Sequence, residues 1–480
     1  MILGVALALR LAHWAAVRRA PFIGQLAMDS WEYERWAREI AAGDWLGHAR
    51  GVFFQAPLYP YLLAILFAVV GPRLDAAYLT QIGLAVAGCY ALYRAGRAMA
   101  GERAGLAAAA LAAVYGPFVF YDVQLLKESL AVTAVCFLLW AMAWASGQST
   151  SAPIGAPSPA APSSKPAATS ASSPVAPSSG PAAAPATAAS VVRGDLVPWL
   201  LVGTLLGILA LLRENALLVA PFLLPLAWRG GLATPSRRAL RVAAFLAGIA
   251  LALAPVALRN GLVGGAFLPT TSQGGVNFYI GINPRADGTY RPIVPGKQTP
   301  ELERREPARL AEQQLGRRLS PAEVSRYWLH RALAWARSHP GDFLRLTLRK
   351  LGMFWSWYEW PDAVDYYYIR GLSPVYRLPL LEFGGVTLLA AFGLGFLGGG
   401  RGRRLVPALL FAAAWMASTV AFFLFARYRL PAVPALLLLA ALPVAACVEA
   451  AEAWWHGRAT RAARPAAFSG QAASAAHSPE

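Results

Sequence analysis

The chain has 480 residues, of which 57% are hydrophobic and 14% are charged, and its mean hydropathy is +0.45. Long apolar runs recur along it, which excludes a soluble globular protein and indicates a polytopic membrane protein. The net charge of +18 comes largely from residues that flank these runs, so it points to membrane topology and lipid headgroups rather than to nucleic acid. The three cysteines all lie in apolar runs and suggest neither a disulfide framework nor a Cys-based metal site.

Ten apolar runs are predicted to be membrane-spanning helices, which makes the expected fold an all-α bundle. A further run, at 61–70, has only about ten residues after Pro60, so we predict that it lies in the membrane interface. The first run lacks a small-residue cleavage site and is interpreted as a retained span. The predicted spans are 2–17, 78–95, 104–120, 128–145, 196–212, 216–228, 243–258, 380–397, 405–425 and 432–448.

The runs divide the chain into six predicted segments. The second segment is almost wholly Ala, Pro, Ser, Gly and Thr, so we expect it to be a disordered cytoplasmic linker. The segments are an N-terminal membrane half with the first outer loop (1–145), the linker (146–193), the middle spans (194–258), a long outer loop with amphipathic helices (259–378), the C-terminal spans (379–450) and a cytoplasmic tail (451–480).

The basic loops predict which side of the membrane each segment occupies. If the run at 61–70 does not cross, the termini and the basic loops 94–103, 229–241 and 401–404 share one side, which the positive-inside rule makes the cytoplasm. Asp29, Glu128 and the long loop then face outward. If the run does cross, the bilayer separates Asp29 from Glu128. Arginines in the outer loop 18–56 speak against the first arrangement, but it accounts for more of the sequence.

Asp29 follows the first span and has two readings. With Glu32 it fits a capping box at the start of a helix over residues 30–42, whose Tyr33, Trp36 and Ile40 share one face. It also fits a catalytic base at the mouth of the bundle, and the two readings are compatible.

Other polar residues are predicted at the same membrane face. Arginine suits phosphate oxygens, whereas carboxylates there would serve as a base or as metal ligands; each arginine alone also fits a lipid-headgroup anchor. The second acidic site is assigned to Glu128 and Asp122, and binding of a donor phosphate to Arg427, Arg429, Arg213 and Arg259. Substrate binding is assigned to Gln55, Tyr59, Asn277 and Tyr279, although a packed turn cluster explains the last two equally well.

Two helices are predicted in the long loop. Ser320-Pro321-Ala322-Glu323 begins the first, which runs to about Ser338. The second, over 343–358, carries Leu344, Leu348 and Trp355 on one stripe and is typical of an interfacial amphipathic helix.

Several motifs, in their order and spacing, resemble the GT-C superfamily of polyprenyl-phosphate-dependent glycosyltransferases. The branch it is most similar to comprises bacterial relatives of the protein O-mannosyltransferases and the lipid A aminoarabinose transferase. The motifs cover most of the chain outside the linker. They are Asp29 with Tyr33; Ala56-Pro57-Leu58-Tyr59-Pro60; Tyr121-Asp122 with Leu126-Lys127-Glu128; Arg213-Glu214-Asn215; Arg259-Asn260; Gly275-Val276-Asn277-Phe278-Tyr279-Ile280-Gly281-Ile282-Asn283-Pro284 with Gly288-Thr289-Tyr290; and Arg427-Tyr428-Arg429-Leu430-Pro431.

The resemblance implies a multi-pass protein of the cell inner membrane with an outward-facing active site. It implies that Asp29 is the base that deprotonates the acceptor, with inversion at the sugar and release of polyprenyl phosphate. Glu128 matches the family's second acidic position. The implied partners are a polyprenyl-phosphate sugar donor, membrane lipids and a protein, lipid or glycan acceptor; a divalent metal is left open. The long loop shows no recognisable globular domain for acceptor recognition.

The competing reading is a secondary transporter or lipid-linked sugar flippase. Such proteins often show internal repeats with interrupted helices in matching halves. The sequence shows no such repeat, and its charges cluster at one face.

Overall fold

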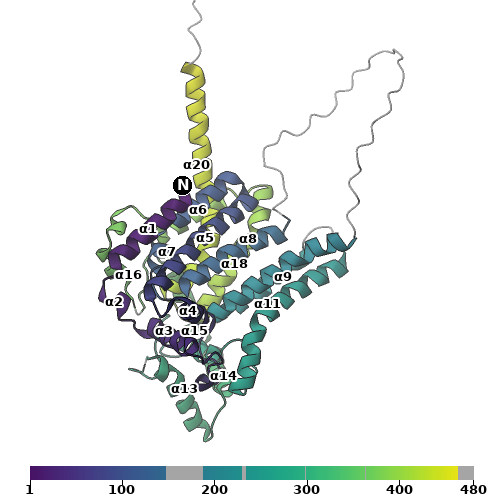
Figure 1. The fold of residues 1–480 in the computed structure, drawn as a ribbon. Helices are drawn as coiled ribbons and strands as arrows, with labels where there is room; N and C mark the ends of the chain where they lie inside the picture. The colour runs from purple at the N-terminus through teal and green to yellow at the C-terminus, as the bar shows by residue number, and fades with distance from the viewer. Residues whose placement is uncertain (148–187, 230–233, 298, 363, 463–480) are drawn as a thin grey trace, which may run out of the picture.

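The structure is a computed structural model that describes residues 1–147, 188–229, 234–297, 299–362 and 364–462. The described residues form helices and no β-strand, so the predicted all-α membrane architecture is confirmed. Most of the predicted linker lies outside the described residues, as does the end of the predicted tail. The tail begins as a helix, since the last helix continues to Ala462 and extends beyond the bundle (Figure 1).

The helices of the membrane bundle follow the predicted spans. They are α1 (Ile2–Val17), α5 (Leu74–Ala100), α6 (Glu102–Ala113), α7 (Gly116–Tyr121), α8 (Glu128–Ala145), α9 (Ala188–Leu212), α10 (Ala220–Arg229), α11 (Pro235–Gly264), α17 (Phe383–Leu394), α18 (Gly400–Val420), α19 (Ala426–Arg429) and α20 (Val433–Ala462).

Shorter helices cover one end of this bundle and its flank. They are α2 (Pro21–Gly24), α3 (Met28–Ala41), α4 (Leu58–Val70), α12 (Gly274–Gly281), α13 (Pro300–Leu315), α14 (Pro321–Ser338), α15 (Pro340–Trp355) and α16 (Tyr366–Leu372).

Among the residues that the structure describes, four helices are long and apolar enough to cross a membrane by length and composition, which makes the chain a multi-pass membrane protein. They are Leu74–Ala100, Glu128–Ala145, Pro235–Gly264 and Ala426–His456. Shorter apolar helices occur at Ile2–Val17, Leu58–Val70, Leu196–Leu212 and Phe383–Leu394, so the total of ten crossings stays a prediction. Helix α4 has 13 residues and is roughly 20 Å long, which is short of a typical ~30 Å hydrocarbon core.

One predicted span is interrupted. The run at 104–120 is not a single helix, because it breaks at Val114 and Tyr115 between α6 and α7. Pro117 lies in the first turn of α7, where its missing N–H costs nothing and its fixed φ favours a helix start. The backbone at the break instead pairs with Leu381, which anchors the chain just before α17.

Helices α9 and α11 form a parallel pair that reaches away from the bundle (Figure 1). Two glycines let their backbones touch. A Cβ at Gly203 would lie 1.9 Å from the carbonyl oxygen of Phe245, and one at Gly248 would lie 2.2 Å from that of Leu200. Small residues at such contacts are typical of helices packed in membranes.

The helices predicted in the long loop are present. Ser320 and Glu323 form a capping box at the start of α14, which ends at Ser338 as predicted. The second helix, α15, begins at Pro340, earlier than predicted, because proline is well placed in a first helical turn. Its stripe residues Leu344 and Leu348 are 57% and 58% exposed, as expected of a helix that lies on a membrane surface.

Candidate active site

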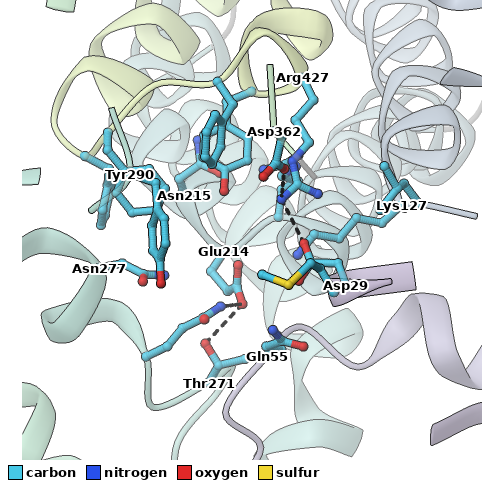
Figure 2. A pocket seen from close by; sticks show the side chains of 18 of the residues that line it. Asp29, Gln55, Lys127, Glu214, Asn215, Thr271, Asn277, Tyr290, Asp362 and Arg427 are labelled. Atoms are coloured by element: carbon cyan, nitrogen blue, oxygen red, sulfur yellow. Dashed lines mark hydrogen bonds and ion pairs between the residues drawn. The ribbon is translucent and has the colours of Figure 1, made fainter. Parts of the chain in front are cut away.

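A cavity of about 570 Å³ lies where the bundle meets the outer helices (Figure 2). Its wall is formed by the start of α3, the α7–α8 loop, the 3-10 helix η3 (Glu214–Val219), α12, α13 and the segment between α18 and α20. Widely separated parts of the sequence therefore contribute to one site.

Asp29 lies in the first turn of α3 and lines the cavity. Met28 before it has φ 52°, a left-handed conformation that no other non-glycine residue adopts in the described part of the chain. Such a conformation costs on the order of 1–3 kcal/mol, and strain of this kind clusters at functional sites. The predicted capping box is wrong: Ala27 is the N-cap, no side chain caps the helix, and Glu32 instead binds arginines.

Arg427 lies among three carboxylates. Its Nη2 is 2.8 Å from Oδ2 of Asp29 and 2.5 Å from Oδ2 of Asp362 (Figure 2). Its Nη1 is 3.5 Å from Oε1 of Glu128. Glu128 is fully buried behind the cavity wall and also forms an ion pair with Arg213. Buried charges are tolerated when they are paired in this way, so the cluster holds Asp29 in a defined position.

Two cations offer positive charge to the cavity. Arg213 lines it, with its guanidinium 4.3 Å from the ring centroid of Tyr428. Lys127 also lines it, and its Nζ forms no hydrogen bond or ion pair with any residue that the structure describes; it lies 5.9 Å from the ring centroid of Tyr33. An ammonium without a protein partner is poised to bind an anion.

Another part of the wall carries neutral and acidic hydrogen-bonding groups. Oε1 of Glu214 accepts hydrogen bonds from Thr271 and Gln273, at 3.2 and 2.7 Å (Figure 2). The hydroxyl of Tyr290 donates to Glu303. Gln55, Asn215 and Asn277 complete this polar wall. Such groups match the hydroxyls of a sugar.

Two of the acids on the wall differ in pKa. Burial raises the pKa of Asp29, but the positive charges of Arg427, Lys127 and Arg213 outweigh it and hold the pKa below its usual range. Burial, together with the negative charges of Asp29 and Asp362, raises the pKa of Glu303 to about 7 against the opposing hydrogen bond from Tyr290. Asp29 is therefore ionised at neutral pH, whereas Glu303 titrates there.

The structure places Arg429 away from the cavity, against the prediction. Its side chain is fully buried, and Nη2 lies 2.8 Å from Oε1 of Glu359. The same guanidinium donates to the carbonyls of Phe354, Ser356 and Tyr358. Both of its terminal nitrogens contact buried groups of the protein and none faces the cavity, so its role is structural.

Arg259 is also a structural residue and does not line the cavity. Its guanidinium donates to the carbonyls of Leu46, Gly47 and Gly51 and lies 3.7 Å from the ring centroid of Phe53. It thus fixes the first outer loop, and the phosphate role predicted for it is not supported.

Three other predicted residues lie outside the cavity wall. Asp122 pairs with Arg10 at 2.7 Å inside the bundle. Tyr59 is buried and donates to Gln81. Tyr279 packs on a tryptophan of α14, with ring centroids 4.6 Å apart. Of the predicted site residues, the cavity wall contains Asp29, Arg427, Arg213, Gln55 and Asn277, with Glu128 behind it.

Sequence reasoning missed several cavity residues. Lys127, Glu214 and Tyr290 lie inside the motifs that carry the family resemblance, so a signal existed, but no role was assigned to them. Glu303 lies in a highly charged stretch that reads as a solvated helix face, and Asp362 follows an aromatic stretch that reads as membrane belt. Only the folded chain brings these two acids to the cavity.

The carboxylates of the site do not form a ready metal site. Asp29 and Asp362 both direct an oxygen at Arg427, so a guanidinium occupies the position between them. Among the described residues no group of three or more His, Cys, Asp or Glu side chains is arranged to hold a metal ion.

Comparison with known proteins supports the family resemblance. Residues 54–151 match the dolichyl-phosphate-mannose-protein mannosyltransferase family, which confirms the resemblance to GT-C glycosyltransferases. No curated protein matches the chain.

Among solved structures, the chain is similar to the oligosaccharyltransferase of Archaeoglobus fulgidus in the apo form, with a TM-score of 0.48 and 14% identity over 92% of this chain and 50% of that one. It is similar to the same archaeon's oligosaccharyltransferase AglB in complex with an inhibitory peptide and a dolichol-phosphate, with a TM-score of 0.49 and 13% identity over 97% of this chain and 52% of that one. It is also similar to ArnT from Cupriavidus metallidurans bound to undecaprenyl phosphate, with a TM-score of 0.39 and 14% identity over 94% of this chain and 78% of that one. The chain spans about half the length of the archaeal enzyme.

Proposed function

We propose that this GT-C-like chain is an integral membrane glycosyltransferase that moves a sugar from a polyprenyl-phosphate donor to an acceptor at the outer face of the membrane. The observation that carries the proposal is one cavity in which an ionised carboxylate, Asp29, lies beside a cluster of cations. A transferase of this type needs both, one for the acceptor and the other for the leaving phosphate.

The cations Lys127, Arg213 and Arg427 bind the donor phosphate. Guanidinium groups suit phosphate oxygens, and an unpaired ammonium adds a mobile point charge. In the reaction the bond between the anomeric carbon and the phosphate oxygen breaks, and negative charge accumulates on that phosphate. Positive groups that are already in place stabilise the developing charge without reorganising.

Asp29 acts as the general base. A hydroxyl of the acceptor attacks the anomeric carbon from the side opposite the phosphate, so the sugar is transferred with inversion. The hydroxyl proton passes to Asp29, and polyprenyl phosphate leaves with the bonding electron pair. The low pKa of Asp29 keeps it ionised and able to receive the proton, and its ion pair with Arg427 fixes its orientation.

The cavity also has an apolar edge that suits a lipid. Leu217 and Leu218 of η3 line it, and the side chain of Leu218 is 45% exposed. Phe222, one turn further along the chain, is 46% exposed. A prenyl chain that passes this edge would remain among apolar side chains while its phosphate enters the cavity.

The test uses the purified protein in detergent micelles with a panel of undecaprenyl-phosphate-linked hexoses and pentoses. The acceptor is a detergent extract of the envelope of cells that lack the protein. Asp29→Asn keeps the size of the side chain but removes its basicity, so we expect a normal melting temperature and loss of transfer by at least about 100-fold. Asp342→Asn is the matched control, because Asp342 is exposed on α15 and binds only Arg345 among the described residues. Substantial transfer by Asp29→Asn, or none by the parent with every donor, would overturn the proposal.

A further inference from the structure

Glu303 is a cavity carboxyl whose position is set by helix α13. Its side chain lines the cavity and accepts a hydrogen bond from the hydroxyl of Tyr290. Tyr290 is itself held by aromatic contacts, with its ring centroid 5.2 Å from that of Phe423 and 6.2 Å from that of Phe425. The carboxyl of Glu303 is therefore oriented by a rigid support.

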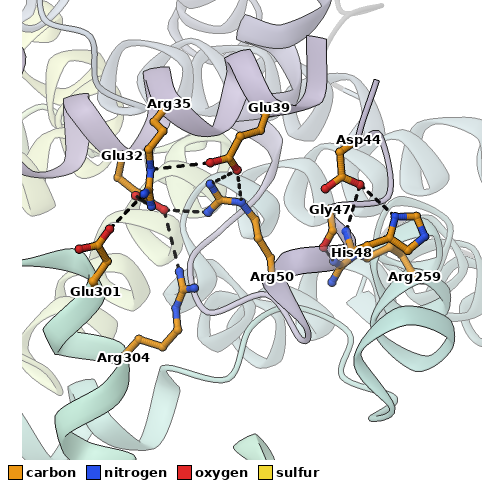
Figure 3. Close-up of polar contacts among 10 residues, drawn as sticks. All are labelled: Glu32, Arg35, Glu39, Asp44, Gly47, His48, Arg50, Arg259, Glu301 and Arg304. Atoms are coloured by element: carbon orange, nitrogen blue, oxygen red, sulfur yellow. Dashed lines mark hydrogen bonds and ion pairs between the residues drawn. The ribbon is translucent and has the colours of Figure 1, made fainter. Parts of the chain in front are cut away.

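The neighbours of Glu303 on α13 bind helix α3, which carries Asp29. Glu301 accepts a hydrogen bond from Arg35 at 3.0 Å, and Arg304 lies 3.9 Å from Glu32 (Figure 3). Both contacts flank Glu303 in the sequence. They fix α13 against α3 and so fix Glu303 relative to Asp29.

Glu32 is the centre of this contact. It is 1% exposed and receives Arg50 at 2.7 Å and Arg35 at 2.8 Å (Figure 3). Arg50 in turn stacks over Trp36, with 4.4 Å to the ring centroid. A buried carboxylate that is surrounded by guanidinium groups is costly to separate from them, and Arg304 of α13 is one of the groups around Glu32.

Glu303 differs from the three carboxylates around Arg427. Asp29, Asp362 and Glu128 each form an ion pair with Arg427, whereas Glu303 forms none with a residue that the structure describes. Its carboxyl is therefore not used to balance a protein charge and is available to a ligand.

We propose that Glu303 binds the acceptor, accepting a hydrogen bond from a second hydroxyl beside the hydroxyl that Asp29 deprotonates. This inference rests on the proposed transferase function. It assigns the acceptor a chemical class, namely a molecule with two neighbouring hydroxyl groups. Glu303 would thus select the acceptor and orient it for attack.

The charges of the cavity assign Glu303 to the acceptor rather than to the donor. In an inverting displacement the nucleophile and the leaving group lie on opposite sides of the anomeric carbon. The phosphate goes to the cations Lys127, Arg213 and Arg427, and a carboxyl without a cationic partner would repel it. The acceptor hydroxyl, in contrast, approaches Asp29, whose negative charge acts on Glu303.

The test measures the half-saturating amounts of the two substrates separately. The acceptor probe is the envelope extract, titrated by dilution, and the donor probe is the undecaprenyl-phosphate sugar that the parent uses. For Glu303→Gln we expect the half-saturating amount of extract to rise by about tenfold, with that of the donor within about twofold of the parent. Glu306→Gln is the matched control: it lies one turn further along α13, outside the large cavity, and binds Arg309. It should leave both values unchanged.

A second variant, Tyr290→Phe, tests the same inference if Glu303→Gln does not fold. Tyr290→Phe removes the hydroxyl that orients Glu303 and keeps the ring that packs on Phe423. For this variant we expect the half-saturating amount of extract to rise by about threefold.

The pH dependence supplies a readout that a structural role would not produce. Glu303 is faced by Tyr290, Asp29, Asp362 and Arg427, and its pKa is about 7. The ionised form accepts a hydroxyl better, so the half-saturating amount of extract should fall as the pH rises from 6 to 8. In Glu303→Gln this dependence should vanish.

Each result decides between the hypotheses. Unchanged use of the extract by Glu303→Gln and Tyr290→Phe would overturn this inference and leave the transferase function standing. A change in donor use alone would assign Glu303 to the donor sugar and overturn the acceptor role. Activity of Asp29→Asn, or no transfer by the parent, would overturn the function and this inference with it.

Discussion

Two arginines that are two residues apart should have opposite mutant phenotypes. Arg427 faces the cavity and Arg429 is fully buried against Glu359. We predict that Arg429→Gln destabilises the protein, whereas Arg427→Gln leaves it folded but inactive. The reason is that each variant removes the arginine partner of different carboxylates, and these differ in whether water can solvate them.

The exposure of these carboxylates to solvent determines how much stability each variant loses. The side chains of Asp29 and Asp362 are each 23% exposed and reach the cavity, so water solvates them when Arg427 is removed. Glu359 is 2% exposed, and its oxygens accept no hydrogen bond in the described structure. The ion pair with Arg429 is therefore what balances its buried negative charge. Leaving a buried charge unpaired costs about 3–5 kcal/mol. The expected loss for Arg429→Gln is of that order.

A double variant separates the charge from the hydrogen bonds. Arg429→Met combined with Glu359→Met removes both charges, and buried ion pairs are often replaced by apolar residues at little cost. The carbonyls of Phe354, Ser356 and Tyr358 still lose their donor, at roughly 1–3 kcal/mol for a buried group without a partner. The double variant should therefore recover part of the loss.

The assay is thermal unfolding of the purified variants in one detergent, read by the fraction that stays monodisperse after heating, together with transfer activity. Arg429→Gln should melt well below the parent, the double variant should lie between them, and Arg427→Gln should melt near the parent without transfer. A parental melting temperature for Arg429→Gln would refute the argument, as would a double variant less stable than Arg429→Gln.

Three further changes have expected outcomes. Lys127→Gln removes the unpaired ammonium, so binding of undecaprenyl phosphate, measured by calorimetry, should weaken by about tenfold or more. Gly275→Ala places a Cβ 1.8 Å from the carbonyl oxygen of Ser325 and should lower the melting temperature, whereas Gly274→Ala meets nothing within 4 Å and should not. The folded pKa of Glu303, about 7, lies above its ordinary value, so the folded protein should lose stability as the pH rises from about 4.5 to 7, and a melting series of Glu303→Gln should show a smaller loss across that window.

The sequence predicted the fold well, because apolar length and charge are local signals. The one break inside a predicted span shows the limit. Residues 104–120 are apolar throughout, and Pro117 is compatible with both a continuing helix and a new one. The backbone pairing with Leu381, far along the chain, stabilises the break, and such a partner is not visible in a local pattern.

The candidate site was predicted in part, for a related reason. Asp29, Arg213 and Arg427 were identified because acids and arginines at the ends of apolar runs stand out. Arg429 has the same local signal as Arg427, yet it points into the protein. A helical segment turns the side chains of residues i and i+2 in different directions, and which of the two meets the cavity depends on packing.

Helix α3 links the two halves of the proposed site. Its first turn carries Asp29 after the strained Met28, and the next turn carries Glu32, which accepts a hydrogen bond from Arg50 and lies 3.9 Å from Arg304 of α13. A left-handed backbone at Met28 persists only if surrounding contacts over-determine it. The ion pairs of Asp29 with Arg427 and of Glu32 with Arg50, both just after Met28 in the sequence, are such contacts. Helix α3, which is strained beside the base, also contacts α13, which carries Glu303, so both proposed acceptor-side carboxylates are positioned by one element.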